Sequence, residues 1–296
     1  MKRGFKTVAI IVSFVLLIVV LSLAFVACDK KDAVSPVDYA KQNTYDVTTE
    51  TMSIVPSEGS AELTAKVYSP TGAEARFGLL FFVGTVIPPE YYDYLGEALA
   101  KQGYVVAIPS VPFAYFGYDS QSRPAADAIL TRFNGIQFFV GGHSQGGGSA
   151  MRFACEEIEN VQGAIFLAPL TFGARESSQE EYDKWNESHP EWFNQNSDGT
   201  IDRADTLKNT TLPTLLLEAD GDKILSPSDK KDALSKMPEK MQHQVLENAC
   251  HMGFSTAEMT LAGDGEGLSD EDKQNQRLLT VSYVLDFLQI TVCGQK

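Results

Sequence analysis

Residues 136–148 read Ile-Gln-Phe-Phe-Val-Gly-Gly-His-Ser-Gln-Gly-Gly-Gly, and this stretch decides the fold that we expect. Its first half is apolar and contains β-branched and aromatic residues, which predicts a buried strand. Its second half is a glycine-rich turn around Ser144, after which residues 149–155 continue at helical spacing. Residues 142–146 therefore form a G-x-S-x-G pattern between a strand and a helix, and that context makes the pattern specific.

The residue types of this turn suit a nucleophile. A serine hydroxyl is weakly nucleophilic and must be presented to a base and to a substrate at once. A sharp turn does this by straining the backbone of Ser144, and Gly142 and Gly146 let neighbouring backbone pass close by. The helix that begins near Gln145 directs free N–H groups at the serine. A turn with a capping serine is the structural alternative, and a phosphate loop is disfavoured because no Gly-Lys-Ser/Thr follows.

Length and charge narrow the class of protein. The chain has 296 residues, which fits one large domain or one domain with an insertion. Its hydrophobic content of 44% is sufficient for a sizeable core. The formal net charge of -15 argues against nucleic acid as a partner, because contacts to phosphates require an excess of Lys and Arg.

The N-terminus has the character of a targeting segment. Three basic residues among the first six precede an uncharged apolar run over residues 8–26, which resembles a bacterial secretory signal. Residues 25–28, Phe-Val-Ala-Cys, resemble a lipoprotein processing box with Cys28 as the lipidated residue, although leucine is usual in place of the phenylalanine. An uncleaved transmembrane helix is the alternative for residues 1–28. Either reading anchors the chain to the membrane outside the cytoplasm, with residues 29–46 as a polar tether.

Strand-like and helical patterns alternate after the tether. Two alternating runs, 47–55 and 61–68, predict an antiparallel pair at a sheet edge, joined by a turn at 56–59. The further strands are expected at 77–83, 104–109, before the Ser144 turn, at 162–168, at 214–219 and at 242–246, and the helices at 90–102, at 124–133, after Ser144 and after a cap at Ser269. This alternation predicts a mostly parallel sheet covered on both faces.

Four histidines are candidates for the base that such a serine needs. His143 lies inside the turn, His189 in a polar insertion and His243 in an expected strand. His251 follows a strand, where a loop at the C-terminal edge of the sheet is expected. Open α/β sheets build their sites from such loops, so we predict His251 as the base. A half-buried structural histidine is the alternative.

An acidic residue that orients the histidine is expected between the serine and the histidine in chain order. Residues 219–227 follow a strand and contain two carboxylates, Asp220 and Asp222. The residues alone leave both open. A turn carboxylate that caps the following helix is the structural alternative for Asp222.

These motifs together resemble those of the α/β-hydrolases, and in particular of small bacterial esterase-like members. Residues 142–146 resemble the nucleophile elbow of that family, and residues 250–254, Cys-His-Met-Gly-Phe, resemble its histidine loop. Residues 219–225 are similar to its G-x-x-D-x-x-V acid loop, with alanine in place of the first glycine. Residues 84–92 look like the loop that supplies a second oxyanion donor, and Gly-Asp-Gly at 263–265 also resembles this branch.

The resemblance spans residues 77–287 apart from one insertion, and it implies the α/β-hydrolase fold. That fold is of the α/β class, with a mostly parallel central sheet and helices on both faces. We expect the domain over residues 47–296, with the polar, acidic insertion at 171–212 as a small cap over the site.

The resemblance also implies a set of site residues. Ser144 would be the nucleophile, His251 the base, Asp222 the orienting acid with Asp220 as the alternative, and the backbone N–H groups of Gln145 and Thr85 the oxyanion donors. We expect no cofactor and no metal. The expected partner is a small-molecule ester.

Each of two segments outside these motifs has two possible interpretations. Residues 194–205 resemble a calcium loop in spacing, but Asn194 and Asp205 at its first and last positions weaken binding, and Asn-Ser-Asp-Gly at 196–199 is also an ordinary turn. Residues 111–118 are rich in aromatics and follow a strand, so they are expected to line an apolar pocket or to pack on the sheet edge.

The leading hypothesis is a membrane-anchored, extracytoplasmic serine hydrolase that acts on carboxylic esters. One alternative is a non-catalytic binding protein on a hydrolase scaffold, because a fold does not determine a function. The other alternative keeps the same triad but cleaves a different bond, as a thioesterase, a lipase or a peptidase would.

Overall fold

The structure is a computed structural model, and it describes residues 45–54, 62–72, 74–112, 114, 118–171, 193–195, 201–203, 205–259 and 261–294. The expected signal at 1–28 with its lipidated Cys28, nearly all of the tether and the turn at 56–59 lie outside the described residues. Most of the expected cap at 171–212 lies outside them too. Its described parts are residue 171, residues 205–212 and the backbone of the short strands β7 (Phe193–Gln195) and β8 (Ile201–Arg203). These expectations therefore stay predictions.

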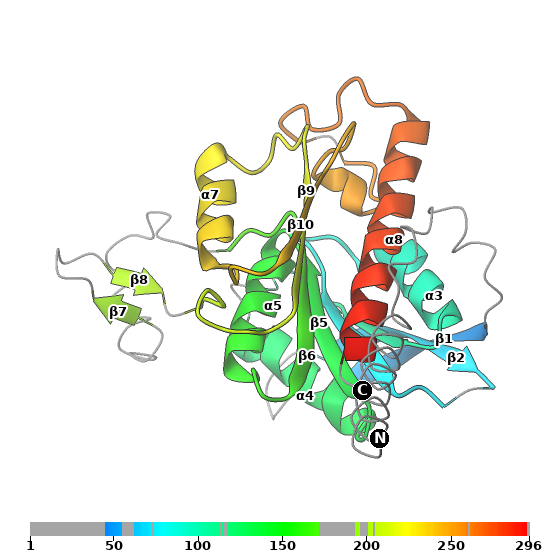
Figure 1. Ribbon diagram of the computed structural model, residues 1–296. Helices are drawn as coiled ribbons and strands as arrows, with labels where there is room; N and C mark the ends of the chain where they lie inside the picture. The colour runs from blue at the N-terminus through cyan, green and yellow to red at the C-terminus, as the bar shows by residue number, and fades with distance from the viewer. Residues whose placement is uncertain are drawn as a thin grey trace, which may run out of the picture.

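Within the described residues, eight strands form one central sheet in the order β1-β2-β4-β3-β5-β6-β9-β10 (Figure 1). The strands are β1 (Asp46–Ile54), β2 (Leu63–Thr71), β3 (Phe77–Phe82), β4 (Val105–Pro109), β5 (Gln137–His143), β6 (Val161–Leu167), β9 (Thr214–Ala219) and β10 (Gln242–Leu246). β1 and β2 form the expected antiparallel edge pair, and the neighbours from β4 through β10 pair in parallel. The predicted mostly parallel sheet is confirmed.

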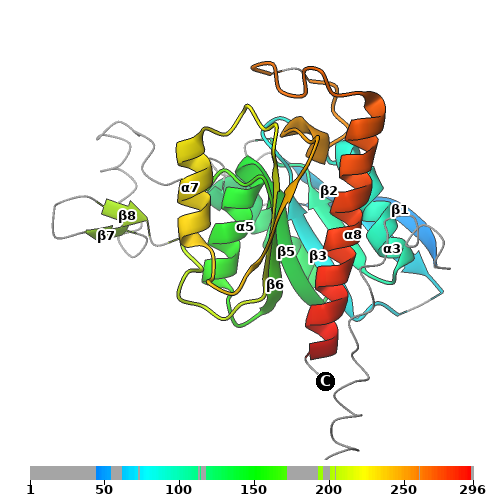
Figure 2. The ribbon, with the colours of Figure 1, turned by 45° about the horizontal axis from the view of Figure 1, so that its top comes forward.

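Helices cover both faces of this sheet. They are α3 (Asp93–Lys101), α4 (Arg123–Arg132), α5 (Gln145–Glu156), α7 (Pro227–Lys236) and α8 (Asp270–Gly294), with short 3-10 turns η2 (Pro89–Tyr92) and η5 (Met252–Phe254) and a π-helical turn η3 (Tyr118–Ser122). α5 and α7 lie on one face, and α3 and α8 lie on the other (Figures 1 and 2). The central strands are buried on both faces, which explains why they read as continuous apolar runs in the sequence.

The C-terminal helix α8 packs into the core. It begins after a capping box in which Ser269 Oγ accepts the N–H of Asp272 and the Asp272 carboxylate accepts the N–H of Ser269, as predicted. Among the described helices, α8 alone is long and apolar enough to cross a bilayer, but 44% of its most apolar window is buried inside the protein. Val284, Leu285 and Phe287 are fully buried, so α8 serves as a core helix.

The pattern did not predict α7 as a helix in its own right. Its N-terminus is nevertheless a complete capping box, because Ser226 Oγ accepts the N–H of Asp229 and the Asp229 carboxylate accepts the N–H of Ser226. Proline at the first helical position further favours a helix start there. The amphipathic pattern of this helix is weak, since only Asp229, Ala233 and Lys236 are buried.

The contact between α3 and the sheet generates a stability prediction. A Cβ added at Gly96 would lie 2.5 Å from two ring carbons of Tyr68. That ring is fully buried and its hydroxyl is 2.5 Å from Asp93 Oδ1, so it cannot swing away. We expect Gly96→Ala to lower the free energy of unfolding by about 1–3 kcal/mol, measured by urea denaturation. Gly294→Ala is the matched control, since nothing lies within 4 Å of a Cβ there. Equal stability of the two variants would contradict this packing.

Candidate active site

Ser144 lies at the sharp junction between β5 and α5, with φ 54° and ψ -123°. Non-glycine residues rarely adopt this conformation, and it persists only where the surroundings hold it. Here the backbone is held on both sides. The Ser144 N–H donates to Leu167 O at 3.1 Å, and the Ser144 carbonyl accepts the N–H groups of Gly147 at 2.9 Å and Leu170 at 2.8 Å. The strain predicted from the sequence is present.

Two glycines of the motif are required by close backbone contacts. A Cβ on Gly142 would overlap the carbonyl of Gly146, and a Cβ on Gly146 would overlap the carbonyl oxygens of Phe82 and Val83 at the end of β3. The first turn of α5 therefore rests directly on the backbone of two strands. This confirms the predicted need for glycine at both positions.

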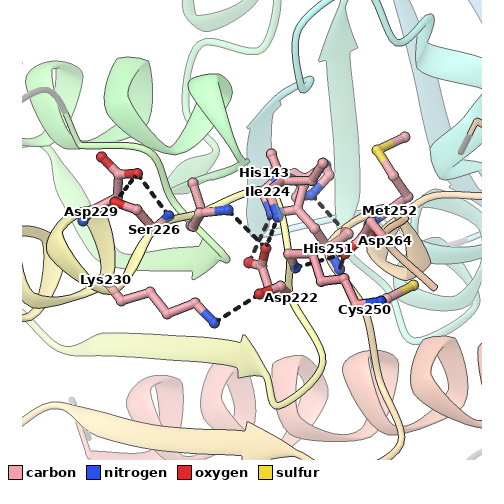
Figure 3. Close-up of polar contacts among 12 residues, drawn as sticks. His143, Asp222, Ile224, Ser226, Asp229, Lys230, Cys250, His251, Met252 and Asp264 are labelled. Carbon is pink, nitrogen blue, oxygen red and sulfur yellow. Dashed lines mark hydrogen bonds and ion pairs between the residues drawn. The ribbon is translucent and has the colours of Figure 1, made fainter. Parts of the chain in front are cut away.

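Asp222 and His251 form a buried pair at the same edge of the sheet (Figure 3). Their side chains are 1% and 2% exposed, and Asp222 Oδ2 lies 3.0 Å from His251 Nδ1. The other oxygen of the carboxylate accepts the N–H groups of Ile224 at 2.8 Å and Leu225 at 2.9 Å. A carboxylate in this position makes Nδ1 the protonated nitrogen of a neutral ring, which leaves the Nε2 lone pair able to accept a proton.

Burial by itself would raise the pKa of Asp222, because it disfavours the charged form. The hydrogen bond and the charge of His251, together with the N–H groups of Leu225 and Ile224, outweigh that effect. The pKa of Asp222 is therefore lowered below its ordinary value of 3.8, and the carboxylate is ionised at neutral pH.

Asp220, which the residues alone left open as the acid, binds the backbone before the histidine. Its two oxygens accept the backbone N–H groups of Asn248 and Ala249, each at 3.1 Å. Asp220 thus ties the end of β9 to the start of the histidine loop. The structure brings His251 together with Asp222 and not with Asp220.

His143, the residue before Ser144, contacts both the ring and the backbone of His251. The ring of His143 lies 4.8 Å from the ring of His251, between centroids, and His143 Nε2 lies 3.1 Å from the carbonyl oxygen of His251. Among the described residues, no side chain forms a hydrogen bond with the half-buried Ser144 hydroxyl. Ser144 follows β5, Asp222 follows β9 and His251 follows β10, so all three lie at the C-terminal edge of the parallel part of the sheet.

Two backbone N–H groups near the Ser144 turn have no hydrogen-bond partner in the described part of the chain. Gln145 is the first residue of α5, and Thr85 follows β3, whose end touches Gly146. Within the described part of the chain, neither N–H group donates a hydrogen bond. The next residue, Val86, has φ 52°, a strained value for a β-branched side chain, and its N–H donates to Pro112 O at 2.8 Å. Free N–H groups at a helix start and a strained turn are suited to bind negative charge.

Side chains hold the histidine loop in place. Asp264 is 4% exposed and accepts three backbone N–H groups, from Lys223 at 3.0 Å, His251 at 3.2 Å and Met252 at 2.9 Å. One carboxylate therefore joins the loop that carries Asp222 to the loop that carries His251 (Figure 3).

The buried Gln276 of α8 holds the residue before the histidine. Its side-chain amide pairs with both backbone groups of Cys250, at 3.0 Å and 2.8 Å. Sequence reasoning singled out residues 263–265 only by resemblance and missed Gln276. No local pattern reports a pairing across 26 positions.

The remaining expectations fall partly outside the described residues. Of the aromatic segment at 111–118, Val111, Ala114 and Tyr118 are buried and Pro112 is exposed, and the other four residues are not described. In the calcium-like segment, only the backbone of β7 and β8 and the buried Asp205 are described. No group of three or more His, Cys, Asp or Glu that could hold a metal is found among the described residues.

Asp264 generates a prediction. In Asp264→Asn, one oxygen becomes an NH2 group, which would face a backbone N–H and leave that buried N–H without an acceptor. We expect a loss of about 1–3 kcal/mol in the free energy of unfolding, measured by urea denaturation at neutral pH. Asp270→Asn is the control, because Asp270 is exposed at the start of α8. A loss no larger than that of the control would mean that the three hydrogen bonds of Asp264 do not hold the two loops.

Comparisons with known proteins agree with this architecture. A model of the alpha/beta hydrolase family matches residues 78–183. A thermophilic esterase from Thermogutta terrifontis is 15% identical, with a TM-score of 0.58 over 82% of this chain and 92% of that chain. Est1E from Butyrivibrio proteoclasticus is 15% identical, with a TM-score of 0.55 over 81% of this chain and 99% of that chain. A CIB-like hydrolase from Thermoplasma acidophilum is 17% identical, with a TM-score of 0.51 over 81% and 99%.

A comparison with curated protein sequences gives no significant match. At the identities of the solved structures, the likeness establishes the fold and no particular activity. The chain has the α/β-hydrolase fold that its motifs predicted.

Proposed function

We propose that this protein is a serine hydrolase that cleaves small carboxylic esters through an acyl-enzyme on Ser144. The observation that carries the proposal is the buried Asp222–His251 pair beside a serine with φ 54°. Strain of this kind persists where presenting a side chain matters. The two free N–H groups of Gln145 and Thr85 add a site for the negative charge that forms during acyl transfer.

The reaction follows from the proposed roles. Ser144 Oγ attacks the acyl carbonyl while His251 Nε2 takes its proton, and a tetrahedral oxyanion forms. The carbon–oxygen bond to the alcohol then breaks, and His251 returns the proton to the leaving alkoxide. Water, deprotonated by the same ring, attacks the acyl-enzyme and forms a second tetrahedral intermediate. Its bond to Ser144 Oγ then breaks, His251 returns the proton to that oxygen, and the carboxylic acid leaves. Asp222 holds the Nδ1–H tautomer and stabilises the imidazolium that forms twice per cycle.

The oxyanion would accept hydrogen bonds from the N–H groups of Thr85 and Gln145. Each such donor contributes about 3 kcal/mol at the transition state, because its dipole is already oriented before the charge appears. An ester is the substrate class we propose. Thioesters and peptides would use the same residues, and they are the comparison substrates in the labelling test below.

We further propose that the enzyme works outside the cytoplasm, held at the membrane by residues 1–28. Support comes from the basic start, the apolar run that follows it and the cysteine at position 28. Mass spectrometry of the protein from bacterial membranes tests this. A lipid-modified Cys28 or an intact residue 1–28 segment in the membrane fraction is expected, and an unmodified chain in the soluble fraction would contradict it.

The nucleophile is tested by covalent labelling. We expect a fluorophosphonate probe to phosphonylate Ser144 in the full-length protein, located by mass spectrometry, and short acyl esters to be hydrolysed. Ser144→Ala should lose both reactions. Ser149→Ala is the matched control, because Ser149 is a fully buried serine of the same helix. A folded wild-type protein that neither labels nor turns over any ester, thioester or peptide would favour the binding-protein alternative.

The acid is tested by a pair of asparagine variants. We expect Asp222→Asn to lower kcat about ten-thousand-fold, because an amide facing His251 Nδ1 favours the wrong tautomer. Asp220→Asn should leave kcat near the wild-type value, since the side chain of Asp220 bonds the backbone of residues 248–249 and not His251 in the described structure. Kinetics on an activated ester measures both. The assignment of Asp222 fails if Asp220→Asn is the more damaging change.

A further inference from the structure

A chain of buried hydrogen bonds runs behind the proposed site. The N–H of Gly84 lies 3.0 Å from the Tyr92 hydroxyl, and that hydroxyl lies 2.8 Å from His143 Nδ1. His143 Nε2 lies 3.1 Å from the carbonyl oxygen of His251. Tyr92 and His143 are fully buried. These contacts link four residues that come from four different segments of the sequence.

The two ends fix the direction of every bond in this chain. The Gly84 amide can only donate, so the Tyr92 oxygen accepts from it. Among the described residues, His143 Nδ1 is the one acceptor within hydrogen-bond distance of the Tyr92 hydroxyl, so the hydroxyl donates its hydrogen there. The His251 carbonyl can only accept, so His143 carries its hydrogen on Nε2. His143 is therefore neutral, because a second hydrogen on Nδ1 would leave the Tyr92 hydrogen without an acceptor.

Burial supports this assignment. It lowers the pKa of His143 well below 6.5, and the neighbouring His251 lowers it further. Burial also raises the pKa of Tyr92 far above 10, so the phenol keeps its hydrogen. The groups are packed without a gap, since a Cβ on Gly84 would lie 3.1 Å from His143 Nδ1 and 3.3 Å from the Tyr92 hydroxyl.

The hydrogen-bond chain connects the two parts of the proposed reaction centre, the oxyanion site and the base. Gly84 is the residue before Thr85, which offers one of the free N–H groups. His251 is the proposed base, and its ring lies against the ring of His143. Apolar side chains of similar shape would fill this volume without requiring matched partners, and buried polar groups are costly unless they are paired. The matched polarity therefore indicates a demand on geometry beyond packing.

We propose that Tyr92 and His143 are positioning residues that lock the Thr85 turn and the His251 loop into one arrangement. This inference rests on the proposed function. His143 binds the carbonyl of His251 through Nε2 and the Tyr92 hydroxyl through Nδ1. The Tyr92 hydroxyl in turn binds the N–H of Gly84. The oxyanion donor and the base thereby keep a constant separation. Because His143 stays neutral, it also places no positive charge against the imidazolium that forms on His251.

The test compares four variants of the full-length protein. Tyr92→Phe removes only the hydroxyl that joins the two halves. His143→Asn keeps an acceptor near the Nδ1 position but does not reach the His251 carbonyl, whereas His143→Gln places an N–H donor near the Nε2 position. Tyr68→Phe is the control, because it removes another buried tyrosine hydroxyl. Its partner Asp93 directly follows Tyr92, so this variant loosens the same segment but leaves the hydrogen-bond chain from Gly84 to His251 intact.

The first readout is the rate of fluorophosphonate labelling together with kcat and KM for an activated ester, each corrected for the folded fraction. Tyr92→Phe should slow labelling and lower kcat about tenfold or more with KM little changed, because small misplacements of reacting groups cost that much. Tyr68→Phe should match the wild type, and His143→Gln should label faster than His143→Asn. Equal rates for Tyr92→Phe and Tyr68→Phe, or for the two His143 variants, would overturn the inference.

The second readout is the tautomer of His143, followed by 15N NMR of the histidine side chains. We expect a neutral ring with hydrogen on Nε2 at and above pH 6.5, and a mixed tautomer signal in Tyr92→Phe. A His143 that titrates in this range would contradict the assignment. Absence of labelling in the folded wild-type protein would instead overturn the proposed function, and the role of Tyr92 and His143 in that reaction with it.

Discussion

The backbone contact between the first turn of α5 and the ends of β3 and β5 is the constraint on which the site depends. Glycine at 142 and 146 lets carbonyl oxygens approach where any Cβ would overlap them. That approach sets the sharp junction at which Ser144 takes its positive φ. It also brings the free N–H of Gln145 close to the turn after β3, where Thr85 offers the second one.

The second requirement is that polar groups buried around the histidine loop are paired. The backbone of residues 250–252 has few partners in the sheet ladder, and side chains supply them instead. Gln276 pairs with Cys250, Asp264 accepts two N–H groups of the loop, and His143 donates to the carbonyl of His251. Each of these partners is itself buried, so a displaced loop would leave several polar groups unpaired. A single arrangement of the His251 ring is thereby favoured.

Much of the fold was predictable because its strands are continuous apolar runs bounded by turns, and the elbow has a local signature. The residues alone did not decide which aspartate orients His251. Asp220 and Asp222 are two positions apart, and only the three-dimensional path of the histidine loop shows which one meets His251. Tyr92 read as part of a helix, and nothing in its neighbourhood indicates a partner 51 positions away. α7 was missed because its apolar face is narrow, although its capping box was present in the sequence.

A crystal structure of the protein after reaction with a small fluorophosphonate is the most direct test of Ser144 as the nucleophile and of the oxyanion site. The adduct mimics the tetrahedral intermediate, so its phosphonyl oxygen reports where the oxyanion would lie. We expect phosphorus on Ser144 Oγ and the phosphonyl oxygen about 2.7–3.1 Å from the backbone nitrogens of both Thr85 and Gln145. A phosphonyl oxygen that points away from those two N–H groups, or an adduct on another residue, would contradict it.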